Sequence, residues 1–207
     1  MAAPDPAHAS AAAADAGAGA VAGILLAAGR GSRFDPTGER YKLLQALPNG
    51  EPVVVASARA LQAAVPRVIA VVRAEDAATA NLLRGLGCEV AVCENAGEGM
   101  AASLACGVRR AQDAGGWLIA LADMPYVQPA TMAALADAVT TATTIAAPVH
   151  DGQRGNPVAF GRVHLHALLA LAGDQGARSI LKNNPVNELM VDDPGILQDI
   201  DTPSDIQ

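Results

Sequence analysis

The chain has 207 residues and a net charge of −7, and it is 51% hydrophobic but only 2% aromatic. This length suits one domain with a sizeable aliphatic core, which we predict to span residues 21–207. An acidic chain with so few aromatic residues is a poor nucleic-acid binder, and no apolar run approaches the roughly 18 residues that span a bilayer, so neither nucleic acid nor membrane is expected as a partner.

Two features indicate a cytoplasmic protein. Residues 1–20 contain eleven alanines and no lysine or arginine, which argues against a secretory signal. Proline and glycine breaks in this segment favour a disordered extension. The three cysteines, Cys88, Cys93 and Cys106, form no Cys-x-x-Cys pair and are expected to be buried as small apolar side chains, as in a reducing compartment.

Strands and helices alternate from residue 21 onward. The apolar pattern predicts strands at Val21–Ala28, Arg67–Val72, Cys88–Cys93, Trp117–Ala122 and Thr144–Val149, with helices over 52–64, 74–85, 99–114 and 129–139. Beyond residue 150 we expect an edge strand at Asn156–Phe160, a helix over 163–171, a loop over 173–178, a short helix over 179–183 and a strand over 186–191. This alternation predicts an α/β fold with three α/β/α layers and a mostly parallel, Rossmann-like sheet.

The first predicted strand leads into a basic, glycine-containing loop, Gly29–Arg33, which is followed later by Lys42. Glycines let the backbone approach a bulky anion, and the cationic side chains add positive charge, so the loop predicts a phosphate site. Phe34 stands where the dinucleotide fingerprint needs a third glycine, and Lys42 follows Tyr41, which excludes a Walker-type loop. A plain β-turn after a core strand is the alternative.

Three aspartates follow predicted strands or extended segments. Asp123 comes directly after the apolar strand Trp117–Ala122, where ligands bind in open parallel sheets. Asp199 and Asp201 are two residues apart, so an extended backbone places both on one face. Carboxylates near a phosphate loop suit Mg²⁺. The alternative is that Asp123 and Asp201 each cap a following helix.

The order of these motifs resembles the MobA-like NTP transferase family, most closely its molybdenum cofactor cytidylyltransferases. The matching segments are Leu26–Arg33, Gly99–Leu104, Ala122–Pro125, Gly155–Pro157, Gly173–Arg178 and Asp199–Pro203. The resemblance implies the nucleotide-diphospho-sugar transferase type of fold. It also implies CTP as the nucleotide, because Leu-Ala-Ala-Gly is the form of the first motif associated with CTP.

The resemblance implies a role for each matching residue. The nucleotide-binding residues would be Leu26, Ala27, Ala28, Gly29, Arg30, Gly31, Ser32, Arg33, Lys42 and Ser103. The catalytic residues would be Arg33, Lys42 and Asp123, with Mg²⁺ held by Asp123, Asp201 and Asp199. The second substrate would meet Gly155, Asn156, Pro157, Asp174 and Arg178. Two alternatives stay open: Arg40 in place of Lys42, because the loop is longer than in relatives, and an ion pair between Arg178 and Asp174.

The reaction implied is transfer of CMP from CTP to the phosphate of molybdopterin, with release of pyrophosphate and transient contact with a molybdoenzyme or its chaperone. Because the attacking phosphate is already anionic, no general base is needed, and none of the four histidines lies in a motif. The alternatives are use of GTP, use of a sugar or alcohol phosphate as acceptor, and a non-catalytic chaperone that binds the molybdenum cofactor.

Overall fold

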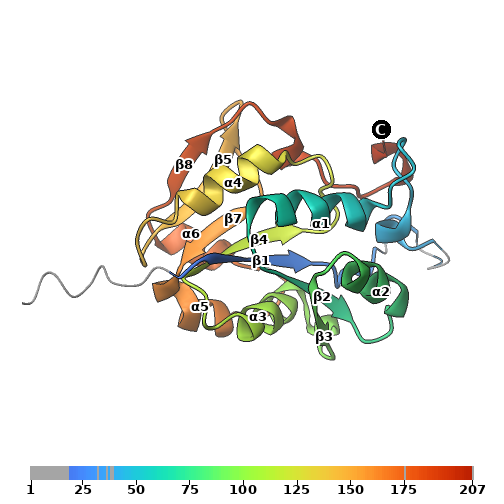
Figure 1. Ribbon diagram of the computed structural model, residues 1–207, viewed down its shortest axis with the longest axis horizontal. Coiled ribbons are helices and arrows are strands. Elements are labelled where there is room, and N and C mark those ends of the chain that lie inside the picture. Colours follow the sequence, from blue (N-terminus) through green and yellow to red (C-terminus); the bar gives the residue numbers. More distant parts are fainter. Residues whose placement is uncertain (1–18, 32, 36, 38–39, 175, 207) are drawn as a thin grey trace, which may run out of the picture.

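The computed structural model describes residues 19–31, 33–35, 37, 40–174 and 176–206, so nearly all of the expected N-terminal extension lies outside the described residues. The described chain forms an eight-stranded mixed sheet in the order β3-β2-β1-β4-β7-β5-β6, with β8 paired to the other side of β5 (Figure 1). The strands are β1 Val21–Leu26, β2 Val68–Arg73, β3 Glu89–Cys93, β4 Gly116–Leu121, β5 Ile145–His150, β6 Gln153–Arg154, β7 Val158–Gly161 and β8 Asn187–Met190.

Helices cover both faces of this sheet, as Figure 1 shows. One face packs against α1 (Val53–Ala64), α2 (Ala77–Gly85) and α4 (Pro129–Asp137), and the other against α3 (Met100–Arg110), α5 (Leu165–Leu169) and α6 (Arg178–Asn183). Short 3₁₀ helices are η2 (Lys42–Leu44), η3 (Ala96–Glu98), η4 (Arg162–His164), η5 (Pro194–Leu197) and η6 (Pro203–Asp205). The predicted three-layer α/β/α architecture is therefore confirmed.

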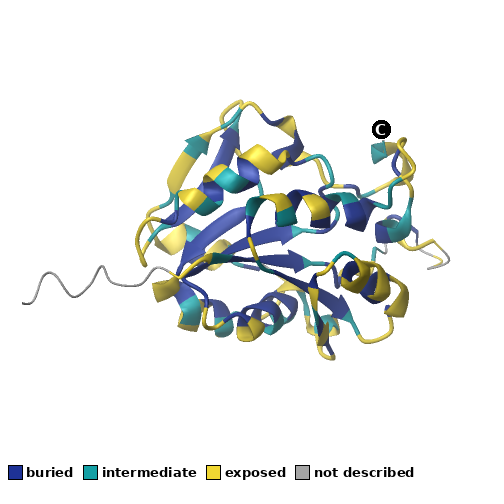
Figure 2. Cartoon of the chain, in the orientation of Figure 1, coloured by how far each residue is buried: buried dark blue, intermediate teal, exposed yellow. Residues whose placement is uncertain are grey.

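Strand β4 lies at the centre of the core. Leu118 points to the layer of α1 and α4, and its neighbour Trp117 points to the layer of α3 and α5. Both side chains are fully buried, and Figure 2 shows the central strands in the colour of buried residues. The buried indole N–H of Trp117 donates to the carbonyl of Ala111 at 2.9 Å. The continuous apolar run that predicted this strand thus reflects burial on both faces.

Two predictions for the C-terminal part are wrong. The strand expected at the sheet edge, Asn156–Phe160, is β7, which lies between β4 and β5 and runs antiparallel to both. Pro157, which has no N–H to give a ladder, precedes the strand, so it does not confine β7 to an edge. The loop expected over 173–178 ends one residue earlier, because α6 begins at Arg178.

The start of α2 also differs from the prediction, for a local reason. Helix α2 begins at Ala77, three residues later than predicted, because the Asp76 carboxylate caps it by accepting from the backbone N–H of Thr79 at 3.1 Å.

The cysteines are free thiols, of which Cys88 and Cys93 are buried and Cys106 is half-buried. Burial raises the pKa of the Cys88 thiol to about 11. Within the described ranges, no helix is long and apolar enough to cross a membrane.

Asp193 ties the C-terminal segment to the start of α4. Its carboxylate is buried and accepts hydrogen bonds from the Gln128 N–H at 2.9 Å, the Thr131 hydroxyl at 2.7 Å and the Gly195 N–H at 3.0 Å. We expect Asp193→Ala to lower the free energy of unfolding by about 3 kcal/mol, because three donors lose their acceptor. Urea denaturation measures this.

The neighbouring Asp192 is exposed, and among the described residues only its backbone carbonyl accepts a hydrogen bond. Asp192→Ala is therefore the matched control, with an expected change within about 0.5 kcal/mol. Equal denaturation midpoints for the two variants would show that the buried carboxylate does not anchor this segment.

Candidate active site

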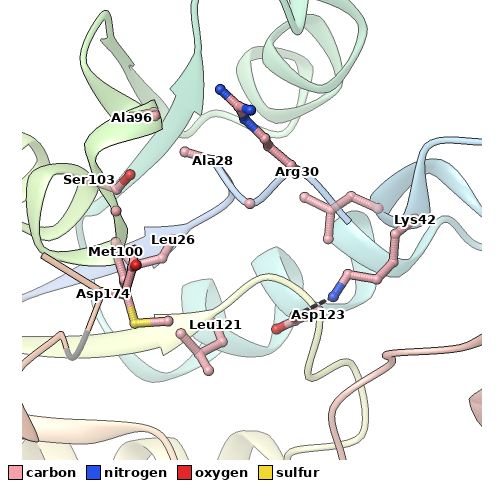
Figure 3. A pocket seen from close by; sticks show the side chains of 14 residues that line it. Leu26, Ala28, Arg30, Lys42, Ala96, Met100, Ser103, Leu121, Asp123 and Asp174 are labelled. Carbon is pink, nitrogen blue, oxygen red and sulfur yellow. Dashed lines mark hydrogen bonds and ion pairs between the residues drawn. The ribbon is translucent and has the colours of Figure 1, made fainter. Parts of the chain in front are cut away.

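A cavity of about 280 Å³ opens at the C-terminal ends of β1 and β4, where the parallel part of the sheet presents its loops (Figure 3). Its walls come from the loop after β1, from η2, from η3 and the start of α3, from the end of β4 and from the loop before α6. The lining residues are Leu26, Ala28, Gly29, Arg30, Lys42, Leu43, Ala96, Gly97, Gly99, Met100, Ser103, Leu121, Asp123 and Asp174.

The glycine-containing loop turns back on itself at Gly31. This residue has φ +63°, a left-handed conformation that glycine adopts without strain, and its carbonyl accepts from the N–H groups of Phe34 and Asp35 at 2.9 and 3.2 Å. A Cβ on Gly31 would lie 3.3 Å from the Cβ of Lys42. The turn therefore packs the loop against Lys42. Ser32, expected to bind nucleotide, lies outside the described residues.

Arg40 is held within the same loop rather than at the cavity. The Asp35 carboxylate accepts from the Thr37 hydroxyl at 2.8 Å and from the Arg40 N–H at 2.7 Å, and these bonds lower the pKa of Asp35. The Arg40 guanidinium pairs with Asp35 at 3.8 Å and lies 5.8 Å from the ring centroid of Phe34. Lys42, and not Arg40, lines the cavity.

Hydrogen bonds to the backbone of Ala122 and Asp123 fix Asp123 at the end of β4. The Ala122 N–H donates to the carbonyl of Leu26 at 3.1 Å, and the buried Ser57 hydroxyl donates to the carbonyl of Ala122 at 2.9 Å. The N–H of the fully buried Ile200 donates to the carbonyl of Asp123 at 2.9 Å. The chain near its C-terminus is therefore docked beside the end of β4.

This docking brings the three aspartates together. Asp199 and Asp201 flank the buried Ile200, as the period-two spacing predicts, and one oxygen from each of Asp123, Asp199 and Asp201 lies within 4.8 Å of the others. Neither Asp123 nor Asp201 is a helix cap, because Gln128 is the N-cap residue of α4 and Thr202 is that of η6. The three oxygens form a donor set suited to a hard divalent cation.

Two cations face these carboxylates. The Lys42 Nζ lies 2.6 Å from Asp123 Oδ2 and 3.8 Å from Asp201 Oδ1, and Arg33 forms an ion pair with Asp201. The Lys42 side chain is largely buried, at 11% exposure, whereas that of Arg33 is 78% exposed. Positive and negative groups thus meet at one end of the cavity, with Lys42 as the more enclosed cation.

Asp205 orders the turn that carries Asp201. Its carboxylate accepts from the backbone N–H groups of Thr202 at 2.6 Å and Asp201 at 3.0 Å, and these bonds help to lower its pKa. We expect Asp205→Ala to weaken the affinity for Mn²⁺ about 10-fold, because the turn loses its acceptor and the Asp201 carboxylate loses its fixed position. Isothermal titration with Mn²⁺ measures this. Asp192→Ala, which leaves the turn intact, should bind as wild type, and equal affinity in both variants would contradict the role of Asp205.

A second, smaller cavity of about 120 Å³ adjoins the first and shares Leu26, Met100 and Leu121 with it. Asn156 and Arg178 supply its polar side chains, and the rest of its lining is Leu104, Ile119, Val158, Phe160, Gly176, Ala177 and Leu181. Arg178 and Asp174 line different cavities, and no ion pair joins them among the described residues.

The other residues predicted at the second substrate do not line this smaller cavity. Asp174 lines the first cavity. Gly155 packs so closely on the backbone of Ile196 that a Cβ would lie 2.3 Å from its carbonyl oxygen, and Pro157 is buried. Ala27, expected at the nucleotide, is buried in the core.

Several lining residues were not found from the sequence. Ala96 and Gly97 belong to η3, and Leu43 to η2, two short elements that have no apolar period to reveal them. The run Ala96-Gly97-Glu98-Gly99, which begins three residues after the predicted strand Cys88–Cys93, was a usable signal, because glycine-rich turns near strand ends commonly border ligand sites.

Residues 23–189 match the MobA-like NTP transferase domain. The chain belongs to this family. It is therefore placed among nucleotidyltransferases, as the sequence motifs implied. The purine catabolism protein PucB of Bacillus subtilis (strain 168) is 32% identical over 119 residues, which cover 55% of this chain and 57% of PucB. The match thus spans little more than half the length of this curated relative.

Two solved structures resemble the whole described fold. Rv0371c from Mycobacterium tuberculosis H37Rv is 29% identical, with a TM-score of 0.77 over 90% of this chain and 95% of that one. Mth528, a nucleotidyl transferase from Methanothermobacter thermautotroptrophicus, is 25% identical, with a TM-score of 0.78 over 90% and 94%. A further structure of Rv0371c, 27% identical with a TM-score of 0.73 over 90% and 95%, is a complex with manganese. The expected nucleotide-diphospho-sugar transferase type of fold is confirmed.

Proposed function

We propose that this chain transfers CMP from CTP to the phosphate of molybdopterin, releases pyrophosphate and uses Mg²⁺. The observation that supports the proposal is the proximity of Asp123, Asp199 and Asp201 to Lys42 at one end of the larger cavity. Nucleotidyl transfer needs this combination, because a cation cluster must neutralise charge at the phosphorus that is attacked.

The donor set fits a divalent cation. Asp123, Asp199 and Asp201 would hold it through carboxylate oxygens, the ligands that Mg²⁺ and Mn²⁺ prefer. When bound, the cation supplies neutralisation of phosphate charge. The manganese complex of Rv0371c supports a divalent metal in a protein of this fold.

The chain's own residues position the two substrates. Lys42 and Arg33 would bind the triphosphate, and Lys42 would keep its place by its contact with Asp123. An oxygen of the acceptor phosphate bonds to the α-phosphorus, and the bond from that phosphorus to pyrophosphate breaks. No proton has to be removed from the attacking oxygen. Accordingly, His150, His164 and His166 line neither cavity.

The acceptor would lie toward the second cavity. Arg178 is a bidentate donor suited to a phosphate, and Asn156 offers both a donor and an acceptor to a heterocyclic ring. The apolar walls around them suit the ring system of molybdopterin. The choice of CTP rests on the sequence Leu26-Ala27-Ala28-Gly29, of which Leu26, Ala28 and Gly29 line the nucleotide cavity.

Pyrophosphate release tests this proposal. Purified protein with Mg²⁺ would be given CTP, GTP, ATP or UTP, each with molybdopterin, with glucose 1-phosphate or without acceptor. We expect release with CTP and molybdopterin only. Preference for GTP would contradict the assignment of CTP as the nucleotide. Release with glucose 1-phosphate but not with molybdopterin would contradict the assignment of molybdopterin as the acceptor. Binding of molybdopterin without release from any nucleotide would identify a non-catalytic carrier.

A further inference from the structure

The two ends of the nucleotide cavity differ in chemistry. Lys42 and Asp123 lie at one end, and Figure 3 shows Ser103 and Asp174 on the opposite side. A triphosphate needs the cationic end, so the nucleoside would occupy the end with Ser103 and Asp174. A second carboxylate in a cavity for a polyanion is unfavourable unless it contacts a hydrogen-bond donor of the ligand.

Asp174 is held in place by the start of α3. Gly99 has φ +117°, and a Cβ there would lie 2.3 Å from Asp174 Oδ1 and 2.7 Å from the carbonyl oxygen of Gly173. The N–H of Ala101 donates to that same carbonyl at 3.1 Å. The loop that carries Asp174 is therefore clamped to the first turn of the helix, and only glycine permits so close an approach.

The Asp174 carboxylate is an acceptor without a partner among the described residues. Asp174 is exposed and lines the cavity, and it has neither a hydrogen bond nor an ion pair with another described residue. An ionised carboxylate only accepts hydrogen bonds, so a ligand group that pairs with it would be an N–H or O–H donor. A ligand that contacts Asp174 in place of water would therefore present a donor at this point.

Ser103 provides a second polar group at a fixed spacing. It lies on α3, four residues after Gly99, so it shares the helix face on which Asp174 rests and is about one turn away. Ser103 is buried and lines the cavity. A hydroxyl can donate where the carboxylate can only accept.

We propose that Asp174 and Ser103 together discriminate cytosine from uracil, an inference that rests on the proposed use of CTP. The Asp174 carboxylate accepts from the 4-amino group, and the Ser103 hydroxyl donates to the neighbouring ring acceptor. Uracil presents O4, an acceptor, to the carboxylate, so a hydrogen bond is replaced by repulsion. Asp174, which the family resemblance placed at the second substrate, is thereby a specificity residue for the nucleotide.

Binding without turnover tests this inference. Isothermal titration with Mg²⁺ and no acceptor would compare CTP, UTP and 2′-deoxy-CTP. We expect the wild type to bind CTP at least about 10-fold more tightly than UTP, and Asp174→Ala and Asp174→Asn to reduce this ratio below about 3-fold, mainly by weakening CTP. Ser103→Ala should reduce it in part. Asp137→Asn, an exposed position at the end of α4, removes one charge from the other helix layer and should keep the ratio.

Three results would overturn the inference. One is an unchanged CTP-to-UTP ratio in both Asp174 variants that unfold at the wild-type temperature. Another is that the Asp174 variants lose a preference for CTP over 2′-deoxy-CTP but still bind CTP more tightly than UTP. The carboxylate would then bind the ribose and not the base. The third is a wild-type protein that binds CTP no more tightly than UTP. If the protein binds CTP selectively but does not transfer CMP to molybdopterin, the proposed function is wrong, whereas the role of Asp174 in recognising cytosine is not contradicted.

Discussion

Asp123→Asn is expected to lower the rate of pyrophosphate release by about a thousandfold, because it removes one charge from the group of carboxylates that would hold the cation. The asparagine keeps the size of the side chain. Lys42 keeps a carboxylate nearby, since Asp201 lies 3.8 Å from its Nζ. We therefore expect the loss in turnover without loss of the fold. Initial rates at saturating CTP and Mg²⁺ measure it.

The control for this variant is Asp137→Asn, which changes the same side chain outside the cavity and should release pyrophosphate at the wild-type rate. Circular dichroism and the unfolding temperature of Asp123→Asn should stay close to those of the wild type. Near-normal pyrophosphate release by Asp123→Asn would refute the role of Asp123 in holding the cation.

The part of the fold that local patterns determine was predictable. From β1 to β5 the strands are rich in apolar residues, and α1, α2 and α3 have an apolar period, so the pattern of burial can be recognised in the sequence. The hairpin after β5 was missed although Asp151-Gly152, with φ of 47° and 76°, is a typical two-residue hairpin turn. The position of β7 between β4 and β5 was not predictable, because it depends on pairing with β4, which is distant in the chain.

In the candidate site, too, local features were predictable from the sequence and long-range contacts were not. The spacing of Asp199 and Asp201 predicted their common face, but their place beside Asp123 depends on the hydrogen bond from Ile200 across the fold. Asp174, predicted at the second substrate, lines the same cavity as Lys42 and Asp123, because Gly173 is bonded to the first turn of α3. Such long-range contacts have no local signature. Sequence reasoning therefore found the chemical groups more reliably than their arrangement.

Lys42→Met is expected to lower kcat/KM for CTP about a hundredfold, because the enclosed cation of the cavity is lost while the apolar stem is kept. Arg40→Met is the matched control. Arg40 is bound to Asp35 and Phe34 outside the cavity, so its loss should change kcat/KM by less than about 3-fold. Steady-state rates at varied CTP measure both. A larger loss for Arg40→Met would mean that the loop opens its contact with Asp35 to bind phosphate, and that Lys42 serves only to balance the charge of Asp123.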